Sequence, residues 1–256
     1  MKKMLFAIAV TAVFASCEKN EKPFSGIRMG EQSKFQHGQA YTWVEVDQQN
    51  KPLKIAITMD AAAMNTLDMS MPGSEGHHHE NSLSLDLPSI PNLPYTHALL
   101  DWNPQGHEPA GIYTIPHFDF HFYTMSEVER KAIPPYEVDS SKFLITPAPA
   151  YLPPTYISPA AGVPQMGRHW IDFTTPELNG AVFTQTFLYG SYDGKVIFYE
   201  PMITKAFIDA SASFERAIPQ PTKYQLTGYY PTVMKITKQG QAVTVSLENF
   251  VFRTAS

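Results

Sequence analysis

The stretch from His117 to Tyr123 reads His-Phe-Asp-Phe-His-Phe-Tyr, and phenylalanine at every second position is typical of a β-strand. Successive side chains of a strand point to opposite faces of the sheet. The three phenylalanines therefore share one face, which we expect to pack into a hydrophobic core. His117, Asp119, His121 and Tyr123 share the other face, and this concentration of polar chemistry needs its own explanation.

Segments on both sides of this strand also predict antiparallel β-structure. The clearest is a hairpin over 182–202, in which Asp193-Gly194 suits the two positive φ angles of a type I′ turn. Other β-rich runs, bounded by polar or turn-forming residues, lie at 40–46, 53–59, 83–87 and 97–102, and a second hairpin is expected over 231–252 with its turn at 238–241. We therefore expect a mainly β protein built of antiparallel sheets, arranged as a barrel or a sandwich.

Helical signals are few and short. Asp60 suits the N-cap of a helix over 60–67, and Ser126 with Glu129 matches a capping box at the start of a helix. A third short helix is expected over 205–214. A few short helices fit the mainly β class, and an α+β fold is the alternative.

The composition excludes several classes of protein. Charged residues make up 17% of the chain and hydrophobic residues 43%, so a disordered, highly charged chain is excluded. The formal net charge of −5 lacks the basic excess of a nucleic-acid-binding protein, and we expect no nucleic-acid partner. The sequence contains no Gly-x-Ser-x-Gly elbow, no phosphate-binding glycine loop and no His-Glu-x-x-His helix.

The N-terminus predicts a bacterial lipoprotein. Two lysines precede an apolar stretch over 4–14, which has the length of a signal peptide rather than a membrane span. Residues 1–16 are the expected signal peptide, because Ala15-Ser16-Cys17 matches a lipobox. Cys17 is the expected acceptor of the lipid anchor, and a plain secretory peptide is the alternative. The chain would then lie on the periplasmic or cell-surface side of the cell envelope, with the outer membrane as the expected membrane.

Three segments follow from this assignment. Residues 17–35 are polar and predict a tether, and residues 36–256 predict a single β-rich domain. Eight prolines between 134 and 164 predict a long extended loop, because proline removes donors from a β-ladder. Such a loop could serve an interface in a homo-oligomer. Cys17 is the sole cysteine, so the mature domain has neither a disulfide nor a thiolate metal site.

The His/Asp face of 117–123 predicts a metal site. Imidazole and carboxylate are ligands of zinc, iron and copper. Residues two apart on a strand are separated by about 6.6 Å and those four apart by about 13 Å. We therefore expect Asp119 to act with either His117 or His121, and His107 and His169 to complete the site.

The reaction, if any, stays open. Two histidines with one carboxylate would suit non-haem iron, and three histidines with an open position would suit zinc and hydrolysis. Glu108, Tyr123 and Glu200 are candidates for supporting residues near the metal. The alternative is a non-catalytic module that binds an unknown small molecule or assembles at the cell surface, in which the polar face is solvated or forms a subunit contact.

A second metal signal lies at 59–80. Four methionines precede His77, His78 and His79, and thioether and imidazole groups together suit copper. This segment predicts a copper-binding loop. The alternative is that the methionines fill the core and that the histidines lie in a solvated loop.

The central block also resembles a known family. Asp-Trp-Asn-Pro-x-Gly-His-x-Pro over 101–109 and Pro-His-Phe-Asp-Phe-His-Phe-Tyr over 116–123 are similar to a family of bacterial extracytoplasmic proteins assigned to a domain of unknown function. Segments 167–170 and 199–204 look like further parts of the pattern, and 64–80 looks like an addition. The resemblance covers roughly 35–254. It implies secretion and a shared β-rich fold, and it implies no particular reaction.

Overall fold

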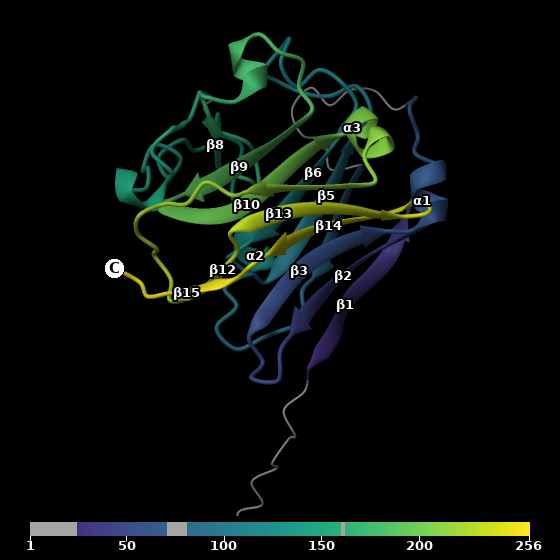
Figure 1. Cartoon of the computed structure of the whole chain (residues 1–256). Coiled ribbons are helices and arrows are strands. Elements are labelled where there is room, and N and C mark those ends of the chain that lie inside the picture. The colour runs from purple at the N-terminus through teal and green to yellow at the C-terminus, as the bar shows by residue number, and fades with distance from the viewer. Residues whose placement is uncertain (1–24, 71–80, 160–161) are drawn as a thin grey trace, which may run out of the picture.

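The computed structural model describes residues 25–70, 81–159 and 162–256 (Figure 1). Strands account for 45% of the structure and helices for 11%, which confirms the prediction of a mainly β fold. The sheets are antiparallel and stack as a sandwich, and they do not close into a barrel within the described residues.

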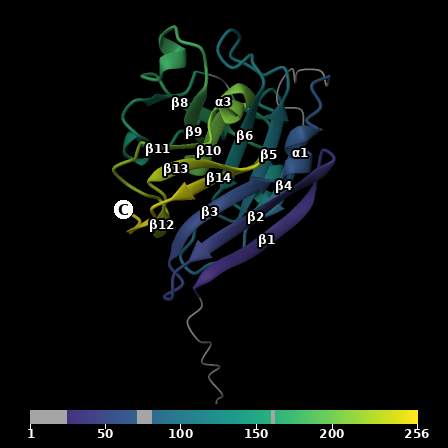
Figure 2. The same cartoon turned by 45° about the vertical axis from the view of Figure 1, so that its right-hand side comes forward.

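Within the described residues, the first sheet has six strands. In spatial order they are β1 (Gly26–Phe35), β2 (Gly38–Val46), β3 (Pro52–Met59), β14 (Ala242–Glu248), β13 (Val233–Gln239) and β11 (Ser213–Ala217). Figures 1 and 2 show this sheet stacked on the second one. A separate pair of short strands, β12 (Gly228–Tyr230) and β15 (Val251–Arg253), lies near the C-terminus.

The second sheet, as far as the structure describes the chain, has seven strands and carries the polar face predicted above. In spatial order they are β4 (Ser82–Asp86), β5 (His97–Asn103), β6 (His117–Tyr123), β10 (Lys195–Thr204), β9 (Gln185–Tyr192), β8 (Arg168–Asp172) and β7 (Tyr156–Ile157). β6 therefore lies in the middle of the sheet, between β5 and β10. The hairpin of β9 and β10 turns at Asp193 and Gly194, with φ angles of 51° and 73°, as the type I′ prediction requires.

The main hydrophobic core lies between the two sheets. The three phenylalanines of β6 are fully buried there, together with Val44, Ile57 and Val245 of the first sheet. The outward face of β6 is buried too, because all seven of its residues are inaccessible. The alternative of a solvated His/Asp face is therefore wrong.

Loops cover this second face of the sheet. Phe143 and Met166, from the chain between β6 and β8, pack on Phe198 of β10. Tyr113, from the loop between β5 and β6, packs with Phe183 against the neighbouring part of the sheet. The proline-rich segment 134–164 belongs to this cover, and its described residues contain just one 3₁₀ turn, η2 (Pro149–Tyr151), and β7. The polar face thus lies between a sheet and its covering loops.

The N-terminal boundary of the fold differs from the prediction. A tether was expected over 17–35, and this is wrong for 26–35, which forms the edge strand β1 paired with β2. Ladder hydrogen bonds join backbone groups and need no particular side chains. The exposed positions of β1 include Ile27 and Met29, while glycines occupy half-buried ones, so no inward apolar pattern marks the strand.

The helices are short, as expected. Asp60 caps α1 (Ala61–Asn65) by accepting a hydrogen bond from the Ala63 backbone, and Ser126 with Glu129 forms the capping box of α2 (Glu127–Lys131). The helix expected over 205–214 is wrong in its second half. α3 (Lys205–Ala210) ends early because the residues from 213 onward pair with β13 as strand β11. Within the described residues, no helix has both the length and the apolar character needed to span a membrane.

Candidate metal centre

The candidate site lies on the covered face of β5, β6 and β10. The strand register fixes its layout, because residues that are partners in neighbouring strands project on the same side. His117 lies opposite Asn103 of β5, and Asp119 lies opposite Asp101. On the other side of β6, the register places Glu200 of β10 next to His121, between the partners Tyr199 and Met202.

The first group of ligands contains His107, His117 and Asp119. The His107 Nε2 atom lies 3.1 Å from Asp119 Oδ2, and the His117 Nε2 atom lies 3.2 Å from Asp119 Oδ1. Their ligand atoms all lie within 4.8 Å of one another. Asn103 Nδ2 donates a hydrogen bond of 2.8 Å to Asp119 Oδ2, which holds the carboxylate in place.

The loop between β5 and β6 brings His107 to this group. Gly106 has a φ of +70°, and a Cβ added there would lie 2.2 Å from the backbone oxygen of Tyr113. The His107 backbone N–H donates to that same oxygen. This position therefore requires glycine, and the tight turn that it permits aims the next side chain at Asp119.

The protonation of two of these histidines is fixed by their outer hydrogen bonds. His107 Nδ1 lies 2.6 Å from the Glu108 carbonyl oxygen, and His117 Nδ1 lies 2.7 Å from the Ile115 carbonyl oxygen. Because a carbonyl oxygen can only accept, each Nδ1 must carry the hydrogen. In the neutral ring, the Nε2 lone pair then points at the carboxylate of Asp119.

The second group contains His121, His169 and Glu200. His121 Nε2 lies 3.3 Å from Glu200 Oε1, and His169 Nε2 lies 3.6 Å from Glu200 Oε2. These three ligand atoms also lie within 4.8 Å of one another. His169 comes from β8, so the group draws one residue from each of three strands.

Asp101 adjoins the second group through the His121 ring. Its Oδ2 atom lies 3.2 Å from His121 Nδ1, on the side of the ring away from Glu200, and its Oδ1 atom accepts from the Ser82 hydroxyl. A carboxylate behind a histidine is a common way to orient an imidazole that binds a metal through its other nitrogen.

Several buried polar atoms in these groups lack a hydrogen-bond partner in the described protein. They are His117 Nε2, Asp119 Oδ1, both ring nitrogens of His121, Asp101 Oδ2 and both carboxylate oxygens of Glu200. Buried polar atoms are nearly always satisfied, so a cluster of exceptions calls for a ligand, ion or water. Two ligands at about 2.0–2.1 Å from a tetrahedral ion lie roughly 3.3 Å apart, close to the nitrogen–oxygen distances seen here.

Burial and neighbouring charges perturb both carboxylates, in opposite directions. Burial opposes ionisation of Asp119, but His117 and His107 outweigh it and hold the pKa of that carboxyl well below its ordinary value. Burial, and then the charges of Asp119 and Asp101, raise the pKa of Glu200 well above its ordinary value. Burial lowers the pKa of His169 to about 3, so its imidazole is neutral and able to bind a metal.

Aromatic side chains wall the site. Phe183 stands edge-on to His117 with ring centroids 5.5 Å apart, and Tyr113 packs on Phe183 at 4.9 Å. The ring of Tyr123 stacks on that of His121, with ring centroids 5.8 Å apart. Among the six ligand residues, the side chains of His107 and His169 have the greatest exposure, at 6% and 13%.

The structure brings together all five predicted ligands but divides them into two groups. His107, His117 and Asp119 form one group, and His121 and His169 form the other. Glu200, expected as a supporting residue, lies among the ligands of the second group. The Glu108 carboxylate accepts a hydrogen bond from the Ala110 backbone N–H. The Glu108 group that contacts His107 is its backbone carbonyl oxygen.

Sequence reasoning missed Asp101 and Asn103. Both lie in the Asp-Trp-Asn run at the end of β5, where Trp102 faces the core. Segment 97–102 was identified as β-rich, and alternation along it, extended by one residue, places both polar side chains on the face opposite Trp102.

The structure describes only part of the segment 59–80 that was predicted to bind copper. His77, His78 and His79 lie outside the described residues. Met59 and Met64 are buried in the main hydrophobic core, where they act as packing residues, while Met69 is exposed.

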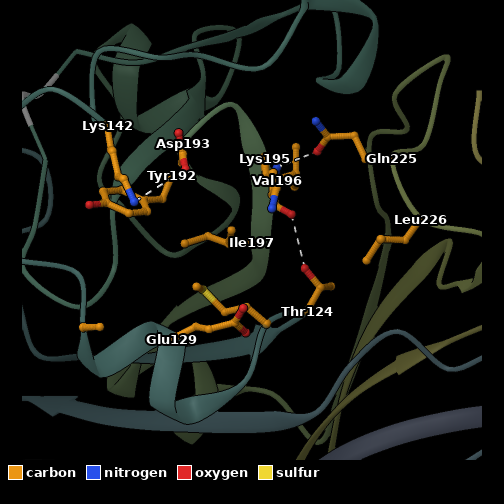
Figure 3. A pocket seen from close by; sticks show the side chains of 12 residues that line it. Thr124, Glu129, Lys142, Tyr192, Asp193, Lys195, Val196, Ile197, Gln225 and Leu226 are labelled. Atoms are coloured by element: carbon orange, nitrogen blue, oxygen red, sulfur yellow. Dashed lines mark hydrogen bonds and ion pairs between the residues drawn. The ribbon is translucent and has the colours of Figure 1, made fainter.

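A surface pocket of about 510 Å³ lies apart from the ligands, at the start of β10 (Figure 3). Lys142, Lys195, Glu129 and Asp193 are among its lining residues, so charges of both signs face it. Lys142 pairs with Asp193 at 3.7 Å. None of the six ligand residues lines this pocket.

Comparison with known proteins gives no match to a family model, a curated protein or a solved structure. The buried His/Asp/Glu groups are therefore the feature of this protein that indicates a function.

Proposed function

We propose that this protein is a metalloprotein of the bacterial cell envelope that binds a divalent transition-metal ion through His107, His117 and Asp119. Zinc, iron and copper all accept this combination of imidazole and carboxylate ligands. Three protein ligands leave at least one coordination position for water or a small molecule, which is the arrangement of catalytic rather than structural sites.

The main support for this proposal is that two imidazole nitrogens face the carboxylate oxygens of Asp119 at close range. In their neutral forms, His107 and His117 direct Nε2 lone pairs at carboxylate oxygens 3.1 and 3.2 Å away. One proton would relieve one of the two repulsions. Two protons would relieve both, but they would leave two imidazolium ions around one carboxylate in a buried site, which is costly. A single cation among the three groups satisfies all of them at once.

Such an ion would act in one of two ways at this site. It would lower the pKa of a bound water molecule and so supply hydroxide near neutral pH, or it would hold a small ligand at its open position. The protein supplies the rest: Asn103 holds Asp119, backbone carbonyls of Glu108 and Ile115 fix the two imidazoles, and the aromatic wall limits access of water.

Metal content tests the proposal. The untagged chain is equilibrated with zinc, freed of loose metal by gel filtration and analysed by elemental mass spectrometry, next to Asp119→Asn and to the exposed control Asp86→Asn. We expect at least one zinc per chain in the parent and the control, and a zinc affinity more than about 100-fold weaker in Asp119→Asn. A parent that keeps its fold by circular dichroism but binds no zinc, iron or copper contradicts the proposal and favours a non-catalytic binding or assembly module.

The location is a separate part of the proposal. The lipobox sequence at Ala15-Ser16-Cys17 supports anchoring through a lipid on Cys17. Labelling with a radioactive fatty acid in a bacterial host, followed by separation of inner and outer membranes, tests it against Cys17→Ala. Label in the parent's outer-membrane fraction, and its loss in the variant, is the expected result. Equal labelling of both proteins, or none, contradicts the anchor.

A further inference from the structure

Three carboxylates lie close together on the covered face of the second sheet. Asp101 is 5% exposed, and Asp119 and Glu200 are fully buried. Within the described residues, these carboxylates contact histidines, Asn103 and Ser82, and none of them forms an ion pair with a lysine or an arginine. The negative charge gathered here thus lacks permanent positive partners, although burying unpaired charge is expensive.

The two groups of ligands adjoin each other. Asp119 and His121 are two positions apart on β6 and point the same way, so their backbone positions are about 6.6 Å apart. Asp101 lies between the two groups: it is opposite Asp119 in the strand register, and its Oδ2 atom is 3.2 Å from His121 Nδ1. One continuous patch of seven ionisable side chains therefore spans β5, β6, β10, β8 and the loop that carries His107.

We propose that this patch holds two divalent transition-metal ions side by side, the second one bound by His121, His169 and Glu200. This inference rests on the proposed function, since the first ion occupies the group around Asp119. The second ion is distinct from it because His117 and His121 are too far apart on one strand to share an ion easily.

Two ions can be balanced by the buried groups when all three carboxylates are ionised. Two divalent ions then exceed the charge of the three carboxylates by one positive charge. A hydroxide bound to the ions, formed when a bound water releases one proton to solvent, makes the buried centre neutral. Sites with two ions about 3.5–4 Å apart are suited to hold such a hydroxide and to use it in hydrolysis.

Asp101 acts as a positioning residue in this arrangement. Its Oδ2 atom lies 3.2 Å from His121 Nδ1, which favours the tautomer with the hydrogen on Nδ1 and leaves the Nε2 lone pair facing Glu200 and the second ion. Its role parallels that of the Glu108 carbonyl behind His107 in the first group.

Metal stoichiometry separates this inference from the proposed function. The untagged full-length chain is isolated from membranes in detergent, with His77, His78 and His79 replaced by alanine so that this run cannot bind zinc. We expect two zinc ions per chain, and about one in each of His107→Ala and His169→Ala, whose side chains are the least buried of the ligands. The control His37→Ala removes an exposed histidine of the β1–β2 turn and keeps two.

Each outcome has a clear meaning. No zinc in the folded parent overturns the proposed function and this inference together. One zinc, lost in His107→Ala but kept in His169→Ala, overturns the two-ion centre and leaves the proposed function standing. If either alanine variant fails to fold, glutamine at the same position replaces it, and the stoichiometry of the parent still decides between one ion and two.

Titration with cobalt(II) tests whether the ions are neighbours. Two cobalt ions joined by an oxygen bridge couple magnetically, so the paramagnetic resonance signal per cobalt falls as the second equivalent binds. A signal that grows in proportion to cobalt up to two equivalents would show two isolated ions and overturn the side-by-side arrangement.

Discussion

Asp101 of β5 lies directly opposite Asp119 of β6, and both carboxylates are buried on the same face of the sheet. Like charges in directly opposed positions destabilise a sheet, and burial makes the repulsion stronger. This pair lies in the middle of a sheet whose other face is tightly packed, so it destabilises the fold when no metal is bound. A bound cation would reverse this effect and stabilise the fold.

Metal removal should therefore lower the melting temperature. A ligand at about 100 times its dissociation constant stabilises the folded state by about 2.7 kcal/mol, which for a domain of this size corresponds to roughly 5–10 °C. Differential scanning calorimetry with zinc and with a chelator measures the shift. Identical melting curves in both conditions would show that no metal binds the folded state in preference to the unfolded one.

Asp101→Asn should change stability in opposite directions with and without metal. Without metal, the substitution removes a repulsive charge and the free energy of unfolding rises. With metal, His121 loses the carboxylate that orients it, and we expect affinity at the second group to fall about 10- to 100-fold. Chemical denaturation and zinc titration measure the two effects. A variant that is destabilised to the same extent in both conditions would assign Asp101 a purely structural role.

Gly106→Ala should weaken metal binding by displacing His107. A side chain at this positive φ costs about 1–2 kcal/mol, and its Cβ would also collide with the Tyr113 backbone oxygen. Gly240→Ala is the matched control, because Gly240 also has a positive φ, of +63°, but has open space around the new Cβ. Both variants should lose stability, but zinc affinity should fall in Gly106→Ala and stay unchanged in Gly240→Ala. Equal zinc affinity in the two variants would exclude His107 as a ligand.

His97 should make stability depend on pH in a defined window. Burial, and then the positive charge of Arg130, lower the pKa of His97 from 6.5 to about 4. The unfolded state therefore binds more protons between these values, and stability falls as the pH is lowered from 6.5 to 4. The loss attributable to this group approaches roughly 3 kcal/mol. Urea denaturation of the parent and of His97→Gln across this range tests it, and parallel pH profiles would refute the assignment.

The central part of the fold was predictable because its signals are local. Alternation over 117–123 identified β6 and the face of each residue, and Asp193-Gly194 identified a hairpin whose turn has the expected φ angles. The members of the first group are also local, since His107 lies in the loop before β6, but the choice between His117 and His121 stayed open.

Other features depend on pairings that a single segment does not reveal. β1 is held by backbone hydrogen bonds to β2, and nothing in its own side-chain pattern shows this. Glu200 becomes a ligand because β10 pairs with β6, although the two strands are far apart in the sequence. The division of the histidines into two groups follows from the same pairing, together with the position of His169 on β8. Strand order in the sheet was the missing information.

Anomalous diffraction from crystals grown with zinc, recorded on both sides of the zinc absorption edge, shows whether metal binds the buried His/Asp/Glu groups. It locates bound metal without relying on any substitution. The account predicts a strong peak bounded by His117 Nε2, His107 Nε2 and the carboxylate of Asp119, and a second peak beside Glu200. Crystals that show no zinc peak at these residues, or a peak confined to surface histidines, would contradict it.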